Sequence, residues 1–279
     1  MRSMYLLPLL LLSSLNCYKA ENRMRSESLA DVLPDSVLNA LHHKKIIFGH
    51  QSVGENLIDG IKMVYSENSS IKKPLFISIE QETNFDSTGF YHFHAGKNRD
   101  PILKIEHFKE TLLKGDFENF DIAFLKLCYV DLNIGNEAQI NKIFETYQNA
   151  VKEITSKYPG LKLIHCTVPL RTRSNYSKGK LASIKRLISG VTGKHINDAD
   201  NRVKEIYNTK IRETFKNDPI FDIAEYESTT PDGKRIRFKN NQVEAFALDN
   251  YYTDDGGHLN TAGQKYLSTK LLILLTSLK

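Results

Sequence analysis

The sequence has few cysteines, three in 279 residues, and no cysteines or histidines at the spacing of a structural zinc site. It also lacks any dense run of basic residues. The formal net charge is only +5, and the lysines and arginines are spread along the chain. A mild, dispersed charge argues against a nucleic-acid partner, and we expect none.

The N-terminus has the anatomy of a signal peptide, although its apolar run is too short for a comfortable membrane span. Arg2 precedes the run Met4–Leu12, and small or polar residues lead to Cys17. We therefore expect a signal peptide over residues 1–17 and a polar tether over 18–34. Two outcomes stay open because the residues before Cys17 match a lipoprotein signal only loosely. Either Cys17 is lipidated and anchors the chain to a membrane of the cell envelope, or the chain is secreted or periplasmic.

The other two cysteines, Cys128 and Cys166, lie in apolar segments that resemble central strands. Buried free thiols are the default interpretation of such positions. A disulfide between neighbouring strands is the alternative in an oxidising compartment, and the sequence does not decide between them.

Residues 35–279 alternate between short apolar strands and amphipathic helices. This pattern predicts one α/β domain, a three-layer α/β/α sandwich with a central parallel sheet. The expected strands are Lys44–His50, Pro74–Gln81, Asp121–Asp131, Leu161–Leu170 and Pro219–Thr229. The expected helices are Ser52–Asn68, Ile105–Gly115, Asn141–Gly160, Asp198–Asn217 and Leu259–Leu278. Three segments are expected to be irregular: Glu82–Asp100, Arg171–Asn197 with a short helix at Leu181–Ser189, and Thr230–Tyr252, a loop or small hairpin.

Two short segments, far apart in the chain, carry the residue types of a serine hydrolase. Ser52 lies in a sharp turn after the first strand, and Asp255 precedes His258 by three residues just before the last helix. A hydroxyl becomes an effective nucleophile when an imidazole accepts its proton and a carboxylate orients that imidazole. In a parallel α/β sheet, such groups gather beyond the C-terminal ends of the strands.

These segments resemble the SGNH hydrolases, the GDSL-like esterases and lipases. The serine turn is Gly49-His50-Gln51-Ser52-Val53-Gly54, which lacks the family's Asp and has one extra residue. The C-terminal segment Asp255-Gly256-Gly257-His258-Leu259-Asn260 matches closely. The resemblance implies a flavodoxin-like SGNH fold and a Ser52–His258–Asp255 catalytic triad.

The resemblance also implies donors for the oxyanion. The family carries a glycine after its second strand, for which Gly96 is our first choice and Gly89 our second. It carries a Gly-x-Asn-Asp after its third strand, where this sequence has Cys128-Tyr129-Val130-Asp131 and so lacks the amide. Asn98 is near enough in sequence to Gly96 to supply the side-chain donor instead.

Each of these residues also has a structural interpretation. Ser52 with Glu55 three residues later fits a helix capping box, a role compatible with catalysis. Asp254 competes with Asp255 as the partner of His258. His50, two residues before Ser52, is expected to fix the serine turn; the alternatives are direct participation and no role in the site.

Three further groups are weaker candidates. Lys126, in an apolar strand, needs a carboxylate such as Asp131 or Asp100 and is expected to be structural, with a role in catalysis or oxyanion binding as the alternative. His92 and His94 alternate along one strand-like segment, but without an acidic third ligand they do not predict a metal site. Arg171 and Arg173 are candidates for an acidic substrate group. We expect no metal and no cofactor.

Taken together, the sequence predicts an exported serine esterase that acts on an ester-linked acyl group of a small molecule, an envelope polysaccharide or a lipid. The alternatives are a surface lipoprotein that keeps the fold without catalysis and a transferase that moves acyl groups such as acetyl. The sequence does not indicate the acyl chain length or the oligomeric state.

Overall fold

The computed structural model describes residues 33–68, 71–80, 85–174 and 195–278, and these belong to a single compact unit, Leu33–Lys279. The expected signal peptide, Cys17 and nearly all of the expected tether lie outside the described residues, as does the short helix expected at Leu181–Ser189. In the described residues, no helix combines the length and apolar character that a membrane span requires.

A six-stranded parallel sheet forms the centre of the unit, in the order β2-β3-β1-β4-β5-β6. The predicted α/β/α architecture is confirmed. Without the edge strand β2, the remaining strands taken in chain order are arranged 2-1-3-4-5, which is the flavodoxin-like order. In that order the strand sequence reverses around β1, so a site is expected beyond the C-terminal ends of β1 and its neighbours. The strands are β1 Lys45–His50, β2 Leu75–Ser78, β3 Gly89–His94, β4 Ile122–Leu125, β5 Lys162–Cys166 and β6 Ile220–Phe221.

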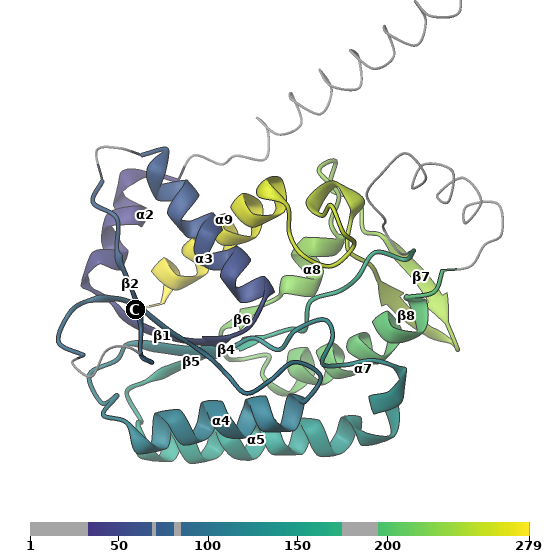
Figure 1. The fold of residues 1–279 in the computed structure, drawn as a ribbon, viewed down its shortest axis with the longest axis horizontal. Coiled ribbons are helices and arrows are strands. Elements are labelled where there is room, and N and C mark those ends of the chain that lie inside the picture. The colour runs from purple at the N-terminus through teal and green to yellow at the C-terminus, as the bar shows by residue number, and fades with distance from the viewer. Residues whose placement is uncertain (1–32, 69–70, 81–84, 175–194, 279) are drawn as a thin grey trace, which may run out of the picture. The chain divides into compact units, whose positions relative to one another are not determined.

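Helices cover both faces of the sheet, as Figure 1 shows. Each face has its own hydrophobic core, because alternate residues of β1 point to opposite sides: Phe48 packs in one core and Ile47 in the other. The first core lies under α2 Asp35–Ala40, α3 Val53–Ser66, α8 Ile223–Ser228 and α9 Thr261–Ser277. The second lies under α4 Pro101–Lys114, α5 Ile140–Lys157 and α7 Asp198–Thr214. Short 3-10 helices are η1 Leu41–His43, η2 Ile134–Gln139 and η3 Asn250–Tyr252.

One strand contradicts the sequence analysis. The segment Glu82–Asp100 was expected to be irregular, but Gly89–His94 forms β3 and pairs with β1 along its whole length, from Lys45↔Gly89 to His50↔His94. Phe90, Tyr91 and Phe93 are buried and favour a strand. His92 and His94 interrupt this apolar pattern, so the sequence alone does not indicate a strand here.

The last expected strand is also shorter than predicted. Of Pro219–Thr229, only Ile220 and Phe221 join the sheet, because Asp222 accepts a hydrogen bond from the N–H of Glu225 and begins helix α8. The hairpin expected within Thr230–Tyr252 is present, as β7 Arg237–Asn240 and β8 Val243–Phe246. Cys128 and Cys166 are both buried free thiols, as the default interpretation predicted.

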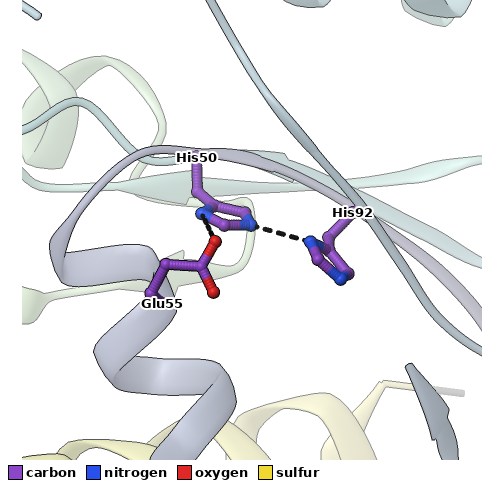
Figure 2. A group of neighbouring side chains, drawn as sticks. All are labelled: His50, Glu55 and His92. Atoms are coloured by element: carbon purple, nitrogen blue, oxygen red, sulfur yellow. Dashed lines mark hydrogen bonds and ion pairs between the residues drawn. The ribbon is translucent and has the colours of Figure 1, made fainter. Parts of the chain in front are cut away.

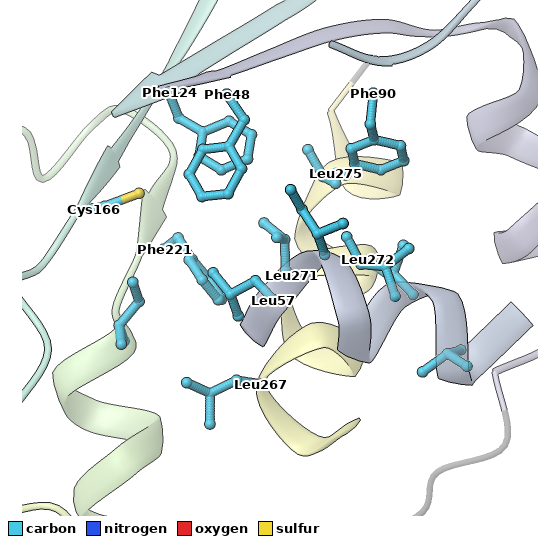
Figure 3. Packing of buried hydrophobic residues seen from close by; sticks show 14 of the residues in the cluster. Phe48, Leu57, Phe90, Phe124, Cys166, Phe221, Leu267, Leu271, Leu272 and Leu275 are labelled. Atoms are coloured by element: carbon cyan, nitrogen blue, oxygen red, sulfur yellow. The ribbon is translucent and has the colours of Figure 1, made fainter. Parts of the chain in front are cut away.

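Close packing of α3 against α9 brings the two ends of the domain together. A side chain at Gly60 would place its Cβ 2.2 Å from the carbonyl oxygen of Gln264, so only glycine allows this approach. Ser268 donates a hydrogen bond of 2.8 Å to the carbonyl of Leu57 across the same contact. Figure 3 shows Leu57 of α3 beside Leu271 of α9 in the core between them. The Ser52 turn directly precedes α3 and the His258 loop directly precedes α9, so the contact between the two helices brings both motifs together.

Candidate active site

Ser52 lies in the turn between β1 and α3 with an unusual backbone conformation. Its φ is 48° and its ψ is −100°, whereas residues other than glycine rarely adopt positive φ. Such strain persists where the surrounding structure imposes it, and it is concentrated at functional sites. The side chain makes no capping hydrogen bond to α3, so the capping box expected at Ser52 and Glu55 does not form.

The second part of the site is the tight loop that precedes α9. A β-bridge between Thr253 and Leu259 closes the loop at its base. The Oδ1 atom of Asp255 accepts the N–H groups of Gly257 and His258 at 2.9 and 2.8 Å. Its other oxygen, Oδ2, lies 2.7 Å from Nδ1 of His258. The carboxylate therefore shapes the loop and orients the ring at once, which explains the three-residue spacing.

The two segments meet at their side chains. The Oγ atom of Ser52 lies 2.5 Å from Nε2 of His258, a hydrogen bond between residues 206 positions apart. Asn56 on α3 accepts the N–H of Leu259 through Oδ1 at 3.1 Å and ties the histidine loop to the serine helix. Asp255 is thus the carboxylate that contacts the ring nitrogen Nδ1 of His258. Ser52, His258 and Asp255 thus form one connected chain of hydrogen bonds.

The charge of Asp255 is favoured by its hydrogen bonds. Burial acts to raise the pKa of this carboxyl, but the donors of His258 and Gly257 outweigh burial and hold the pKa below its ordinary value. The side chains of His258 and Asp255 are 45% and 50% exposed, so water reaches both.

Tyr129, from the loop after β4, packs against the ring of His258. Its ring meets the His258 ring edge-on at 5.3 Å between centroids, and its Oη lies 3.3 Å from Nδ1 and 3.4 Å from Nε2. A Cβ at Gly257 would lie 2.6 Å from the Tyr129 ring, so the glycine before His258 makes room for this tyrosine. Burial raises the pKa of Tyr129, which keeps its hydroxyl protonated as a donor. The sequence analysis missed Tyr129 because the family pattern after this strand calls for an asparagine side chain, and a tyrosine is not part of that pattern.

Gly96 and Asn98, both expected to bind an oxyanion, differ in whether a hydrogen-bond donor remains available. The N–H of Gly96 already donates to Nδ1 of His107 at 2.8 Å, so in this structure it is not a donor toward Ser52. Gly96 has φ +51°, and a Cβ there would lie 2.9 Å from the backbone of Lys104, so the glycine is needed for packing against α4. Asn98 accepts the Lys104 ammonium through Oδ1 at 2.7 Å, which leaves its NH2 group as the end that can donate.

Lys126 is not paired as expected. Its ammonium donates to the carbonyl oxygen of Gln51 at 2.6 Å and lies 3.2 Å from Sγ of Cys128. It therefore holds the backbone of the residue before Ser52, and no carboxylate of the described residues forms an ion pair with it. The expectation that Asp131 or Asp100 would pair with Lys126 is wrong, because Asp131 is taken by another lysine and Asp100 caps α4.

Asp131 organises the loops that follow β3 and β4. It is fully buried and accepts hydrogen bonds from the Lys104 ammonium at 2.6 Å, the N–H of Cys128 at 2.6 Å and the N–H of Arg99 at 2.7 Å. Three donors compensate for the burial of one carboxylate. The Lys104–Asp131 ion pair links α4 to the loops after β3 and β4, in which Asn98 and Tyr129 lie.

The remaining candidates are placed around this centre. His50 is fully buried, and its Nε2 lies 3.1 Å from Nδ1 of His92. Arg173 forms an ion pair with Asp198 at 2.7 Å, and the guanidinium of Arg171 lies over the Tyr129 ring, 5.6 Å from its centroid.

Comparisons with known proteins give structural likenesses at low sequence identity. No family model matches the chain, and no curated protein matches it. An acetyl xylan esterase is similar in structure, with 17% identity, a TM-score of 0.47, and coverage of 81% of this chain and 97% of that one. A lipase/acylhydrolase from Enterococcus faecalis shows 13% identity and a TM-score of 0.48, covering 84% and 96%. The periplasmic domain of a Salmonella lipopolysaccharide acetyltransferase shows 12% identity and a TM-score of 0.42, covering 82% and 83%.

These identities are all below 25% and these TM-scores below 0.5. Such likenesses identify neither a family nor an activity for this chain. The chemistry open to the Ser52 site follows from its own atoms.

Proposed function

We propose that this protein is a serine esterase that hydrolyses an ester-linked acyl group through Ser52. The observation that carries the proposal is the hydrogen-bond chain from Ser52 Oγ to His258 Nε2 at 2.5 Å and from His258 Nδ1 to Asp255 Oδ2 at 2.7 Å. This is the geometry in which a ring nitrogen can accept a hydroxyl proton while a carboxylate stabilises the resulting cation. A serine that only capped α3 would turn its hydroxyl toward the helix, which Ser52 does not do.

In the first half of the reaction, Ser52 Oγ attacks the acyl carbon and His258 Nε2 takes the hydroxyl proton. Asp255 stabilises the imidazolium without itself being protonated. His258 then gives the proton to the leaving alcohol, and the acyl group remains on Ser52. In the second half, His258 takes a proton from water, the hydroxide attacks the acyl-enzyme, and the proton returns to Ser52.

Two donors are proposed for the oxyanion that forms in each half. One is the N–H of Ser52, at the start of the 14-residue helix α3, whose N-terminal end carries partial positive charge. The other is the NH2 group of Asn98, whose orientation is fixed by the Lys104 ammonium. Gly96 is left out of this set because its N–H is committed to His107.

Hydrolysis is proposed over acyl transfer because His258 and Asp255 are open to water, which is then the available acceptor. The natural substrate is proposed to be an acylated glycan or lipid of the cell envelope. This part of the proposal depends on the expected export of the chain and on Cys17 as its lipid anchor. Detergent phase partitioning of the full chain tests the anchor: the native protein should enter the detergent phase, and Cys17→Ser should stay in the aqueous phase.

The test of the activity is hydrolysis of short-chain nitrophenyl esters by purified protein. Ser52→Ala should lower kcat by at least about 10³-fold, since the nucleophile is lost. Ser66→Ala is the matched control at the other end of α3, where the hydroxyl donates a hydrogen bond to the carbonyl of Met63. It should retain native activity. Equal rates for native protein and Ser52→Ala would instead favour a non-catalytic protein with a hydrolase-like site.

A further inference from the structure

A second cluster of polar side chains lies next to the Ser52 turn, and the esterase chemistry does not use it. It joins three elements: His50 at the end of β1, Glu55 in the first turn of α3, and His92 on β3. Figure 2 shows the His50 ring between the Glu55 carboxylate and the His92 ring. The ligand atoms that these three residues offer all lie within 4.8 Å of one another.

His50 has one ring nitrogen that the fold leaves without a partner. The residue is 0% exposed, and its Nδ1 makes no hydrogen bond among the described residues, although it faces a carboxylate oxygen of Glu55 at 3.7 Å. A buried polar atom without a partner costs free energy, so such atoms are rare in folded proteins and call for an explanation. If the other ring nitrogen, Nε2, binds an ion, Nδ1 becomes the protonated nitrogen of the ring, and it faces the Glu55 carboxylate.

The spacing of the cluster fits a metal ion. In tetrahedral zinc sites with Zn–N bonds of 2.0–2.1 Å, two ligating nitrogens stand about 3.3 Å apart. His50 Nε2 and His92 Nδ1 are 3.1 Å apart. The Glu55 side chain is 42% exposed, and it can move toward the two rings without disturbing the core.

The surroundings support the same set of ligands. Glu55 Oε1 is held by Nε2 of His94 at 3.1 Å, and His94 is in turn contacted by Glu80, with 3.5 Å between Nδ1 and Oε1. Ligating carboxylates are commonly oriented by such outer hydrogen bonds.

We propose that His50, His92 and Glu55 form a binding site for a divalent transition metal of the zinc class, with water completing the coordination. Two histidines and one glutamate with an open position are a known zinc ligand set. Imidazole ligands favour Zn²⁺ over Mg²⁺ and Ca²⁺, which prefer oxygen. The sequence analysis expected no metal because it saw no acidic third ligand near His92 and His94. The fold supplies that ligand from α3, a different element.

The ion would connect β1, β3 and α3 around the strained turn that holds Ser52. It would therefore hold the turn in place rather than take part in the ester chemistry. The Lys126 ammonium acts against a cation at this place, so the Glu55 charge is needed to offset it. The proposal does not depend on the esterase activity, because its test reads metal binding alone.

Equilibrium dialysis with Zn²⁺ alone, on protein freed of metal by a chelator, tests the site. One Zn²⁺ should bind per chain, and Mg²⁺ at equal concentration should not displace it. At a hundredfold excess over Kd, the midpoint of thermal unfolding should rise by roughly 5 °C. His92→Ala and Glu55→Gln should each weaken binding more than about tenfold.

His43→Ala is the matched control, because it removes an exposed histidine of η1 outside the cluster. It should bind Zn²⁺ as the native protein does. Glu55→Gln changes a half-exposed side chain, so it should fold normally even where a change at His92 does not. The proposal is overturned if native protein binds no Zn²⁺ in the micromolar range, or if Glu55→Gln binds it as tightly as native protein. In that case His50 and His92 share only their mutual hydrogen bond.

Discussion

At the scale of single residues, Asp255 performs two tasks with its two oxygens. Oδ1 holds the N–H groups that shape the loop before α9, and Oδ2 holds Nδ1 of His258. The division of tasks permits a substitution that separates structure from chemistry. An asparagine keeps an acceptor for the loop but presents an amide NH2 to the ring.

Asp255→Asn should therefore leave the loop intact and lower kcat by about 10³- to 10⁴-fold. The amide forces Nδ1 to accept, so the proton moves to Nε2, which then cannot take the proton of Ser52. Steady-state ester hydrolysis measures this, with KM expected to change little. Asp254→Asn is the neighbouring control and should keep most of the activity. A similar loss in both variants would contradict the assignment of Asp255.

Asp131 allows a prediction about stability at the same scale. Its removal leaves the buried ammonium of Lys104 without its carboxylate and also leaves two backbone donors unsatisfied. Asp131→Ala should lower the free energy of unfolding by about 3–5 kcal/mol, measured by urea denaturation. The double variant Lys104→Met/Asp131→Ala should recover part of this loss.

An exposed pair of the same chemistry provides the contrast for Asp131. Lys114 and Glu110 are neighbours on the surface of α4, at 2.7 Å. Solvent screens such pairs, and so Lys114→Ala should leave the urea midpoint unchanged. If Asp131→Ala lowered the free energy of unfolding as little as Lys114→Ala does, the buried Lys104–Asp131 pair would not have the stabilising effect proposed for it.

At the scale of elements, the approach of α3 to α9 determines whether Ser52 meets His258. Gly60→Ala forces the helices apart because its Cβ would lie 2.2 Å from the Gln264 carbonyl. Overpacking of this kind should cost about 1–3 kcal/mol of unfolding free energy, and the displacement should lower kcat as well.

Thermal unfolding and ester hydrolysis together measure the Gly60→Ala effect. Gly160→Ala is the matched control, since a Cβ there meets nothing within 4 Å. Its stability should stay within about 0.5 kcal/mol of native. Native stability and activity in Gly60→Ala would show that the helix contact does not set the distance between the two motifs.

The sequence predicts the elements that local periodicity determines, but not the features that depend on contacts between distant segments. The long amphipathic helices α3 and α5 and the apolar strand β1 follow from periodicity alone. Strand β3 was missed because its histidines are held by residues of other elements, Glu55 of α3 among them. The same reason explains Tyr129, whose role appears only when the loop after β4 is placed against His258. Contacts between distant segments leave no local signal.

At the scale of the whole molecule, buried histidines make stability depend on pH. Burial lowers the pKa of His165 from 6.5 to about 4 and that of His50 to about 2. In the unfolded chain these rings bind protons below pH 6.5, whereas in the folded chain they stay neutral to lower pH. Their contribution to stability is therefore complete above pH 6.5 and is lost as the pH falls toward the folded pKa.

His165→Gln should reduce this dependence. The native protein should lose about 3 kcal/mol more stability than the variant between pH 7 and pH 4. Urea unfolding at several pH values measures the difference between the two proteins. Burial raises the pKa of Glu227 to about 8, so this residue acts in the opposite sense, but it does so in both proteins and cancels. Parallel curves for the two proteins would contradict the neutral state assigned to His165.

The most direct test of the catalytic assignment is covalent labelling with a fluorophosphonate, followed by peptide mapping. A hydroxyl activated by His258 should take one label per chain, on Ser52, and His258→Ala should slow labelling by orders of magnitude. A folded protein that takes no label, or takes it on another residue, would contradict the assignment of Ser52 as an activated nucleophile.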